Sequence, residues 1–123
     1  MIKLNIVSIR GAITLKENNN EDIIAATKEL LSEIENKNNL NKDDVISILF
    51  SSTKDLNAEY PAKAARLLGY TQCSLMCFNE MEVLNSIKKC IRVMVLYQSS
   101  LEQKNIKHVY LKDAKTLRPD LNE

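Results

Sequence analysis

Five segments of the chain are apolar or alternate between apolar and polar residues over the length of a β-strand, and residues 87–97 are the most informative. In this segment, "IKKCIRVMVLY", both faces beyond Ile91 are apolar, which is typical of a strand covered on each side. Arg92 is the exception. A guanidinium in such a place is costly to desolvate unless it is paired or binds an anion. The other residues of its face are Cys90, Met94 and Leu96.

The remaining four segments predict strands of ordinary character. The first places Ile2, Leu4 and Ile6 on one face, and that face ends at Arg10. A later run, "VISILFSS", is apolar on both faces. The predicted ranges are residues 2–13, 45–52, 71–78 and 107–111.

Two segments have helical spacing. Asn20 can cap a helix with acidic residues in its first turn, and Ile23, Thr27, Leu30, Leu31 and Ile34 form its apolar stripe. In "YPAKAARLLGY", Pro61 suits the first helical position and Gly69 the residue just past the end. No repeat or linker divides the chain, and the tail "LRPDL" is too short to form an element. We therefore expect one α+β domain, residues 1–123, with a single mixed sheet and helices packed on its outer face.

Composition narrows the classes of function. Seventeen basic and sixteen acidic residues give a net charge of +1, which argues against a nucleic-acid binder. No run approaches the roughly 18 apolar residues of a membrane span, and the first residues lack the cleavage site of a signal peptide. Three cysteines without a zinc spacing predict free thiols rather than a metal site. We expect a cytoplasmic protein.

Common catalytic groups are scarce in this chain. His108 is its one histidine, and two glycines are too few for a phosphate-binding loop or a dinucleotide fingerprint. An enzyme with this composition would carry out a reaction that needs little proton transfer and no cofactor.

Polar residues at element ends or within apolar strands are the candidates for chemistry. Each has a structural interpretation: cations on a helix are usually solvated, Cys77 is a small apolar side chain, and Glu80 can simply pair with Arg92. Several arginines converging on one pocket with one carboxylate would instead form a site for a small dianion. The pattern does not identify the anion or its fate. The candidates are Arg10, Lys63, Arg66, Cys77, Glu80, Arg92, Tyr110 and Arg118.

Six blocks, "IRGAIT", "YPAKAAR", "CFNEMEV", "KKCIRVMV", "HVYL" and "LRPDL", occur in an order and spacing that resemble the small monofunctional chorismate mutases of the AroH class. The resemblance implies a homotrimer, a pseudo-α/β-barrel, with active sites between adjacent subunits. It implies an intramolecular Claisen rearrangement of chorismate to prephenate, in the shikimate pathway to phenylalanine and tyrosine. No cofactor, metal or covalent intermediate is expected.

The same resemblance implies roles for individual residues. Arg92 matches the arginine at the ether oxygen of the breaking bond, and Arg10 a carboxylate-binding arginine. Glu80 matches the carboxylate that contacts the substrate hydroxyl, with the Cys77 backbone and thiol beside it, and Tyr110 a nearby hydroxyl donor. Residues 112–123 match a tail that covers the site. The other substrate-binding positions are Tyr60, Ala62, Lys63 and Arg66 from the neighbouring subunit, together with Leu75, Met76, Leu117 and Arg118.

Two alternatives remain open at this stage. One is a non-catalytic trimeric binder of a small anionic metabolite, which the absence of chorismate decay would identify. The other is an imine deaminase on a similar trimeric fold, although such an enzyme is not expected to share these blocks.

Overall fold

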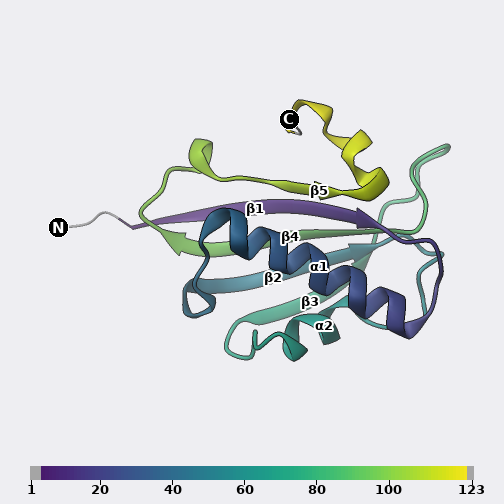
Figure 1. Cartoon of the computed structure of the whole chain (residues 1–123), viewed down its shortest axis with the longest axis horizontal. Helices are drawn as coiled ribbons and strands as arrows, with labels where there is room; N and C mark the ends of the chain where they lie inside the picture. Colours follow the sequence, from purple (N-terminus) through teal and green to yellow (C-terminus); the bar gives the residue numbers. More distant parts are fainter. Residues whose placement is uncertain (1–3, 122–123) are drawn as a thin grey trace.

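The computed structural model describes residues 4–121. It contains one five-stranded sheet in the order β3-β2-β4-β1-β5 (Figure 1). β4 is antiparallel to both neighbours, whereas β3 is parallel to β2 and β5 is parallel to β1. The sheet is therefore mixed, and the predicted α+β class is confirmed. The strands are β1 Asn5–Thr14, β2 Val45–Ser52, β3 Ser74–Asn79, β4 Cys90–Ser99 and β5 Val109–Leu111.

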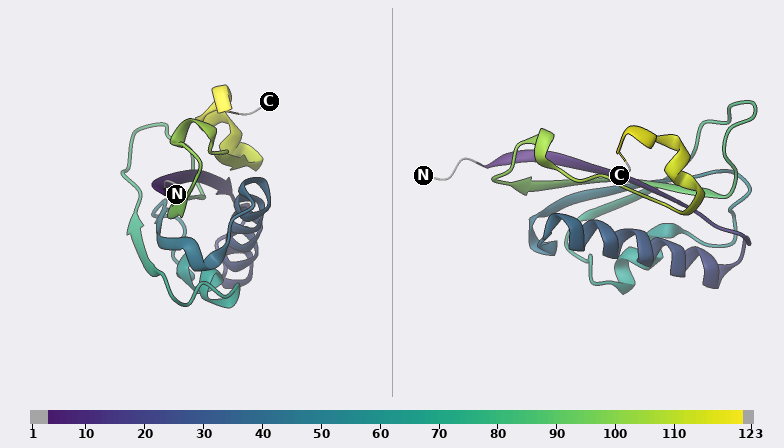
Figure 2. Two further views of the ribbon diagram at one scale, coloured as in Figure 1. Left: turned by 90° about the vertical axis from the view of Figure 1, so that its left-hand side faces the viewer. Right: turned by 45° about the horizontal axis from the view of Figure 1, so that its top comes forward.

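The helix α1, Asn20–Asn38, packs along one face of this sheet (Figure 2). The N-terminal cap is Asn19, one residue earlier than expected. The side chain of Asn19 accepts the main-chain N–H of Asp22 at 2.8 Å. The helix is capped at its C-terminus by Asn39, which takes a left-handed conformation with φ 49°. The predicted stripe is confirmed, because the buried residues of α1 are Ile23, Thr27, Leu30, Leu31 and Ile34.

The second helix, α2 at Pro61–Leu67, has the predicted ends: Pro61 is its first residue and Gly69 has φ 99°. The strand predicted at residues 45–52 is also confirmed. The first strand begins at Asn5, and Ile2 lies outside the described residues.

The main core lies between the sheet and α1. In β4 its members are Ile91, Val93, Val95 and Tyr97, all at most 4% exposed. The opposite face is open, with Met94 36% and Phe78 49% exposed. Within this chain, β4 is therefore covered on one side, whereas its pattern predicts cover on both. Apolar alternation shows that a face needs cover, but it does not show whether the cover comes from the same chain.

The C-terminal segment folds back as two short 3₁₀ helices, Lys112–Leu117 and Pro119–Leu121, drawn in yellow in Figure 1. The expectation that "LRPDL" forms no element is therefore wrong, because a 3₁₀ turn needs only three residues. The segment covers one end of the open face, where Ala12, Cys90, Tyr110 and Ala114 form a second buried cluster with Leu117 packed against it. Among the described residues, no helix has both the length and the apolar character needed to cross a membrane.

Candidate active site

One residue from each strand forms a row across the open face of the sheet. The strand register pairs Arg92 with Ser51 on one side and with Ala12 on the other. Because residues paired across neighbouring strands point to the same face, the row continues to both sheet edges. Its full order is Phe78, Ser51, Arg92, Ala12 and Tyr110.

Glu80 holds the guanidinium of Arg92 in this row. Arg92 Nε lies 3.3 Å from Glu80 Oε1, and the Ser51 hydroxyl donates to the same oxygen at 2.5 Å. The main-chain N–H of Glu80 donates to the carbonyl of Ser52 at 2.8 Å, which fixes the carboxylate beside β2. Arg92 Nε is buried, and the ion pair lacks hydrogen-bond geometry, so this N–H has no acceptor among the described residues. A buried donor without an acceptor is costly, so a ligand oxygen there would be stabilised.

A cavity of about 370 Å³ lies over this row and brings together residues far apart in the sequence. Three arginines line it, from β1, from β4 and from the C-terminal segment. Glu80 pairs with Arg92 and Asp120 pairs with Arg118 at 2.9 Å, so the pocket keeps an excess of positive charge and fits a small anion. The predicted residues that line it are Arg10, Arg92, Tyr110, Leu117 and Arg118.

Two polar neighbours of this pocket were not predicted as site residues. Ser51 donates its hydroxyl to the carboxylate of Glu80 that also contacts Arg92. In the sequence, the hydroxyl residue within the apolar run 45–52 was the feature that could have indicated this role. His108 accepts the main-chain N–H of Arg10 through Nδ1 at 2.9 Å. Burial lowers the pKa of His108, and the charges of Arg10 and Arg118 lower it further. Only the fold places this ring against the first strand.

Cys90 lies on the Arg92 face but is fully buried. Burial raises the pKa of its thiol to about 11, although the charge of Arg92 acts in the opposite direction. The thiol is therefore neutral at physiological pH, and all three cysteines are free. Within the described range, no three His, Cys, Asp or Glu side chains are grouped so that they could hold a metal ion.

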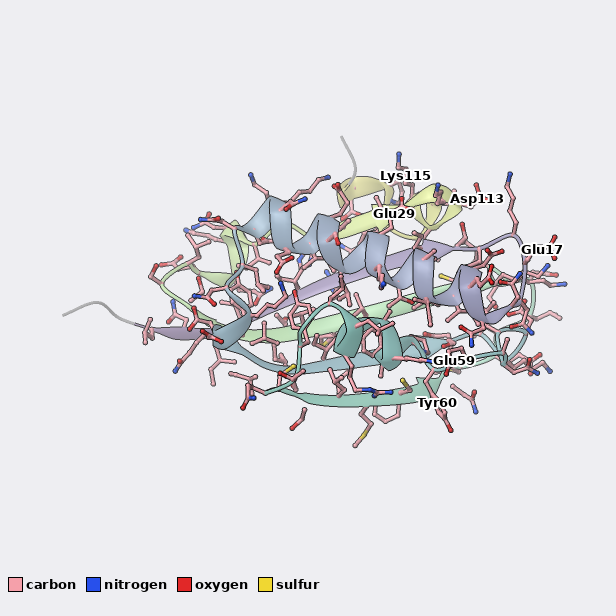
Figure 3. The ribbon with its side chains drawn as sticks, turned by 60° about the horizontal axis from the view of Figure 1, so that its bottom comes forward. Glu17, Glu29, Glu59, Tyr60, Asp113 and Lys115 are labelled. Carbon is pink, nitrogen blue, oxygen red and sulfur yellow. The ribbon has the colours of Figure 1, made fainter. Side chains whose placement is uncertain are left out.

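The remaining predicted residues gather elsewhere, around α2 and β3. Tyr60 and Cys77 line a second cavity of about 440 Å³, and Lys63 lies 3.4 Å from Glu59. Figure 3 shows Tyr60 beside Glu59 at the start of α2, on the opposite side from the C-terminal segment. Within one chain the candidates thus form two groups. The members of this second group are Tyr60, Ala62, Lys63, Arg66, Leu75 and Cys77, whereas Met76 lies on the open face, in register with Leu49 and Met94.

Cys77 does not lie beside Glu80 within this chain, contrary to expectation. Burial raises the pKa of its thiol, although the backbone of Ala62 in α2 acts in the opposite direction, and the side chain packs against the main core. Glu80 points to the other face, toward Arg92. Strand alternation explains the separation, because Cys77 pairs with the buried Phe50 whereas its neighbour Phe78 joins the Arg92 row.

A mixed sheet with helices on one face and an arginine-lined pocket on the other defines a small α+β protein whose pocket fits a small anion. Comparison with known proteins identifies the family to which this chain belongs. Residues 6–121 match the family model described as chorismate mutase type I. The chain is 44% identical over 115 residues to chorismate mutase AroH of Bacillus subtilis, covering 93% of this chain and 91% of that protein. It is 39% identical over 114 residues to chorismate mutase AroH of Thermus thermophilus, covering 92% and 93%.

A solved structure agrees with these matches. A chorismate mutase from Clostridium thermocellum superposes with a TM-score of 0.87 at 50% identity, covering 89% of this chain and 97% of that chain. The chain therefore belongs to the type I chorismate mutase family, and the predicted resemblance is confirmed. It is an isomerase of that kind, which decides against the anion-binder and imine-deaminase alternatives.

Proposed function

We propose that the chain converts chorismate to prephenate in the arginine-lined pocket by electrostatic stabilisation and conformational restraint. The observation that carries this proposal is the guanidinium of Arg92, which stands half-buried in an apolar strand with a carboxylate fixed on one side and a cavity on the other. A rearrangement within one molecule needs no nucleophile and no general base. This agrees with the scarcity of such groups in the sequence.

The first task of the site is to select the reactive shape of the substrate. Chorismate carries two carboxylates and reacts through a compact, diaxial, chair-like geometry, whereas more open shapes are favoured in water. Arg10 and Arg118 line the same cavity and supply cations for these carboxylates, Arg118 in exchange for its ion pair with Asp120, and Tyr110 adds a hydroxyl donor. Holding the compact form lowers the entropic part of the barrier.

The second task belongs to Arg92. As the C–O bond stretches, negative charge builds on the ether oxygen, and a guanidinium already fixed in place meets it without reorganising. The interaction grows between ground state and transition state, so it raises the rate rather than only the affinity. A ~10⁶-fold acceleration needs about 8 kcal/mol. One preorganised donor contributes about 2.7–4 kcal/mol in other enzymes, and orientation supplies much of the rest.

Glu80 has two roles in this proposal. Its contact with Arg92 keeps the guanidinium aimed at the cavity, and Ser51 holds the carboxylate by donating to the same oxygen. Its other oxygen has no protein partner within the described residues. That oxygen is the group we assign to the substrate hydroxyl.

The complete site requires a second subunit. The group around α2 and β3 lies away from the Arg92 pocket, and the uncovered sheet face exposes large apolar side chains of a kind that subunit interfaces bury. A homotrimer would cover this face and bring Tyr60, Lys63 and Arg66 of one subunit to the Arg92 pocket of the next. In the same proposal the chain is one domain, its tail from about residue 112 covers the site, and its free thiols fit the cytoplasm.

Chorismate decay, followed by its ultraviolet absorbance, tests the role of Arg92. Arg92→Ala should stay folded but lose at least about 10²-fold in kcat, since the developing charge loses its donor. Arg92→Lys should remain poor, because an ammonium cannot copy the planar guanidinium. The control is Lys104→Ala, which removes an exposed cation paired with Glu102 and should keep full activity. Near-normal turnover of either Arg92 variant would remove Arg92 from the central role.

A further inference from the structure

The turn that leads into β4 has an unusual backbone. Lys89, the residue just before the strand, has φ 48°, in the left-handed region that favours glycine. A lysine there is strained unless its surroundings fix it. Arg92 follows three residues later, so the conformation of Lys89 sets the direction in which β4 starts.

Asp55 supplies what fixes this turn. The N–H of Lys89 donates to both carboxylate oxygens of Asp55, at 3.0 and 3.2 Å. The Thr53 hydroxyl donates to the same carboxylate at 2.5 Å and accepts the N–H of Cys90 at 3.0 Å. Charge-assisted hydrogen bonds of this kind are shorter and stronger than neutral ones.

The same turn joins three strands at the end of the sheet nearest Arg92. The carbonyl of Lys89 accepts the N–H of Leu15, just past β1, at 2.8 Å. The N–H of Thr53, just past β2, donates to the carbonyl of Cys90 at 3.1 Å. The residue before Thr53, Ser52, accepts the N–H of Glu80. The backbone segments that carry Arg92 and Glu80 are thus hydrogen-bonded to Thr53 and Ser52, respectively, close to the turn that Asp55 holds.

We propose that Asp55 is a positioning residue for Arg92: its carboxylate holds Lys89 in the left-handed conformation and so aims the guanidinium at the cavity. The proposal rests on the role assigned to Arg92 above. Asp55 does not contact substrate in this account, because both of its oxygens already accept hydrogen bonds from the protein. It acts through the backbone.

A rescue experiment tests whether Asp55 acts through the backbone conformation of Lys89. Asp55→Ala should lower kcat by between about tenfold and a hundredfold, the range expected for a displaced catalytic group, while KM stays within about twofold. Adding Lys89→Gly should restore most of kcat, because glycine adopts the left-handed conformation without help from a carboxylate. The matched control is Asp44→Ala, an exposed carboxylate at the other end of β2, which should change neither constant.

A spectroscopic measurement separates this proposal from the proposed function. The Nε–H signal of Arg92 in a ¹⁵N spectrum, assigned by its loss in Arg92→Ala, should be protected from exchange because the atom is buried. Protection should fall in Asp55→Ala and return in Asp55→Ala/Lys89→Gly. This readout holds whatever the reaction is, whereas normal turnover of Arg92→Ala would overturn the proposed function alone.

Three results would overturn the positioning role: unchanged kcat and protection in Asp55→Ala, a loss that Lys89→Gly does not reverse, or kcat losses of Asp55→Ala and Arg92→Ala that add fully in the double variant. If Asp55→Ala does not fold, Asp55→Asn carries the same comparison. Asp55→Asn keeps an acceptor oxygen for Lys89, so its kcat and its protection of the Arg92 Nε–H should lie between those of wild type and those expected for Asp55→Ala. The proposal would also be contradicted if the double variant Asp55→Asn/Lys89→Ala folds and keeps the wild-type kcat, KM and protection of the Arg92 Nε–H.

Discussion

His108 accepts the main-chain N–H of Arg10 at 2.9 Å, so its Nδ1 is unprotonated and the ring carries its proton on Nε2. The cations of Arg10 and Arg118 act on the ring in the same direction as burial, and all three disfavour the imidazolium. Protonation would therefore break the hydrogen bond and add a third positive charge near two arginines of the pocket. At the residue scale, the geometry of Arg10 depends on a neutral histidine.

The lowered pKa of His108 predicts how stability changes with pH. The unfolded chain binds the proton more readily than the folded one, so this group's contribution is present above about pH 6.5 and is lost as pH falls through the folded pKa. His108→Asn keeps an acceptor oxygen near the position of Nδ1 but does not titrate. Urea unfolding between pH 7 and pH 5 should show a smaller loss of stability for this variant than for wild type. Equal losses would show that His108 is not involved.

At the element scale, the pairing of β1 with β5 depends on a glycine. A Cβ built at Gly11 would lie 2.8 Å from the carbonyl oxygen of Val109 and 3.1 Å from a methyl group of Ile34 and of Leu30. The first neighbour is backbone of the adjacent strand, and the other two belong to α1. Gly11 therefore allows β5 and α1 to approach β1 closely, and β5 carries Tyr110 into the pocket.

Gly11→Ala should consequently destabilise the fold by about 1–3 kcal/mol, the usual cost of overpacking. This corresponds to a fall in Tm of about 4 °C per kcal/mol for a chain of 123 residues. The matched change on the same strand is Ser8→Ala, where only main-chain atoms of Ser8 bond Gln103. Thermal unfolding by circular dichroism compares the two. A Tm for Gly11→Ala equal to that of Ser8→Ala would contradict the close approach.

For the whole molecule, the central feature is the division of the candidate residues between two regions. The Arg92 pocket lies on the open face, whereas Lys63 and Arg66 belong to α2 at the other side of β3. A single chain contains each of these two groups of residues once, and they lie apart. In a closed ring of identical subunits, each half can meet its complement on a neighbour, and a site arises at every interface.

Mixed oligomers test this arrangement. Arg92→Ala damages one half and Lys63→Ala/Arg66→Ala the other, so each variant alone should be nearly inactive. Co-refolding equal amounts should give random trimers in which about a quarter of the sites combine two intact halves, and activity should rise to about a quarter of wild type. Size-exclusion chromatography checks that trimers form. If the mixture gains no activity over its components, the shared-site proposal is wrong.

The sequence by itself determined the local features. The stripe of α1, the ends of α2 and the bounds of β2 follow from periodicity and from residues such as Pro61 and Gly69, whose backbone preferences act within a few positions. The burial cost of a charge also made Arg92 stand out. The six motif blocks identified the family, which the comparisons confirm.

Tertiary structure decided what lies next to Arg92 and what stays open. Ser51 and Glu80 lie beside it, and Tyr110 lines the same pocket, only because strands far apart in the sequence pair in one register. Both helices pack on the other face, so the Arg92 row is covered only at its Tyr110 end, by the C-terminal segment, and Cys77 is turned away from Glu80. Register and layer order depend on long-range hydrogen bonds and on packing of the whole sheet. Periodicity is a local property, and it carries no information about which distant strand becomes the neighbour.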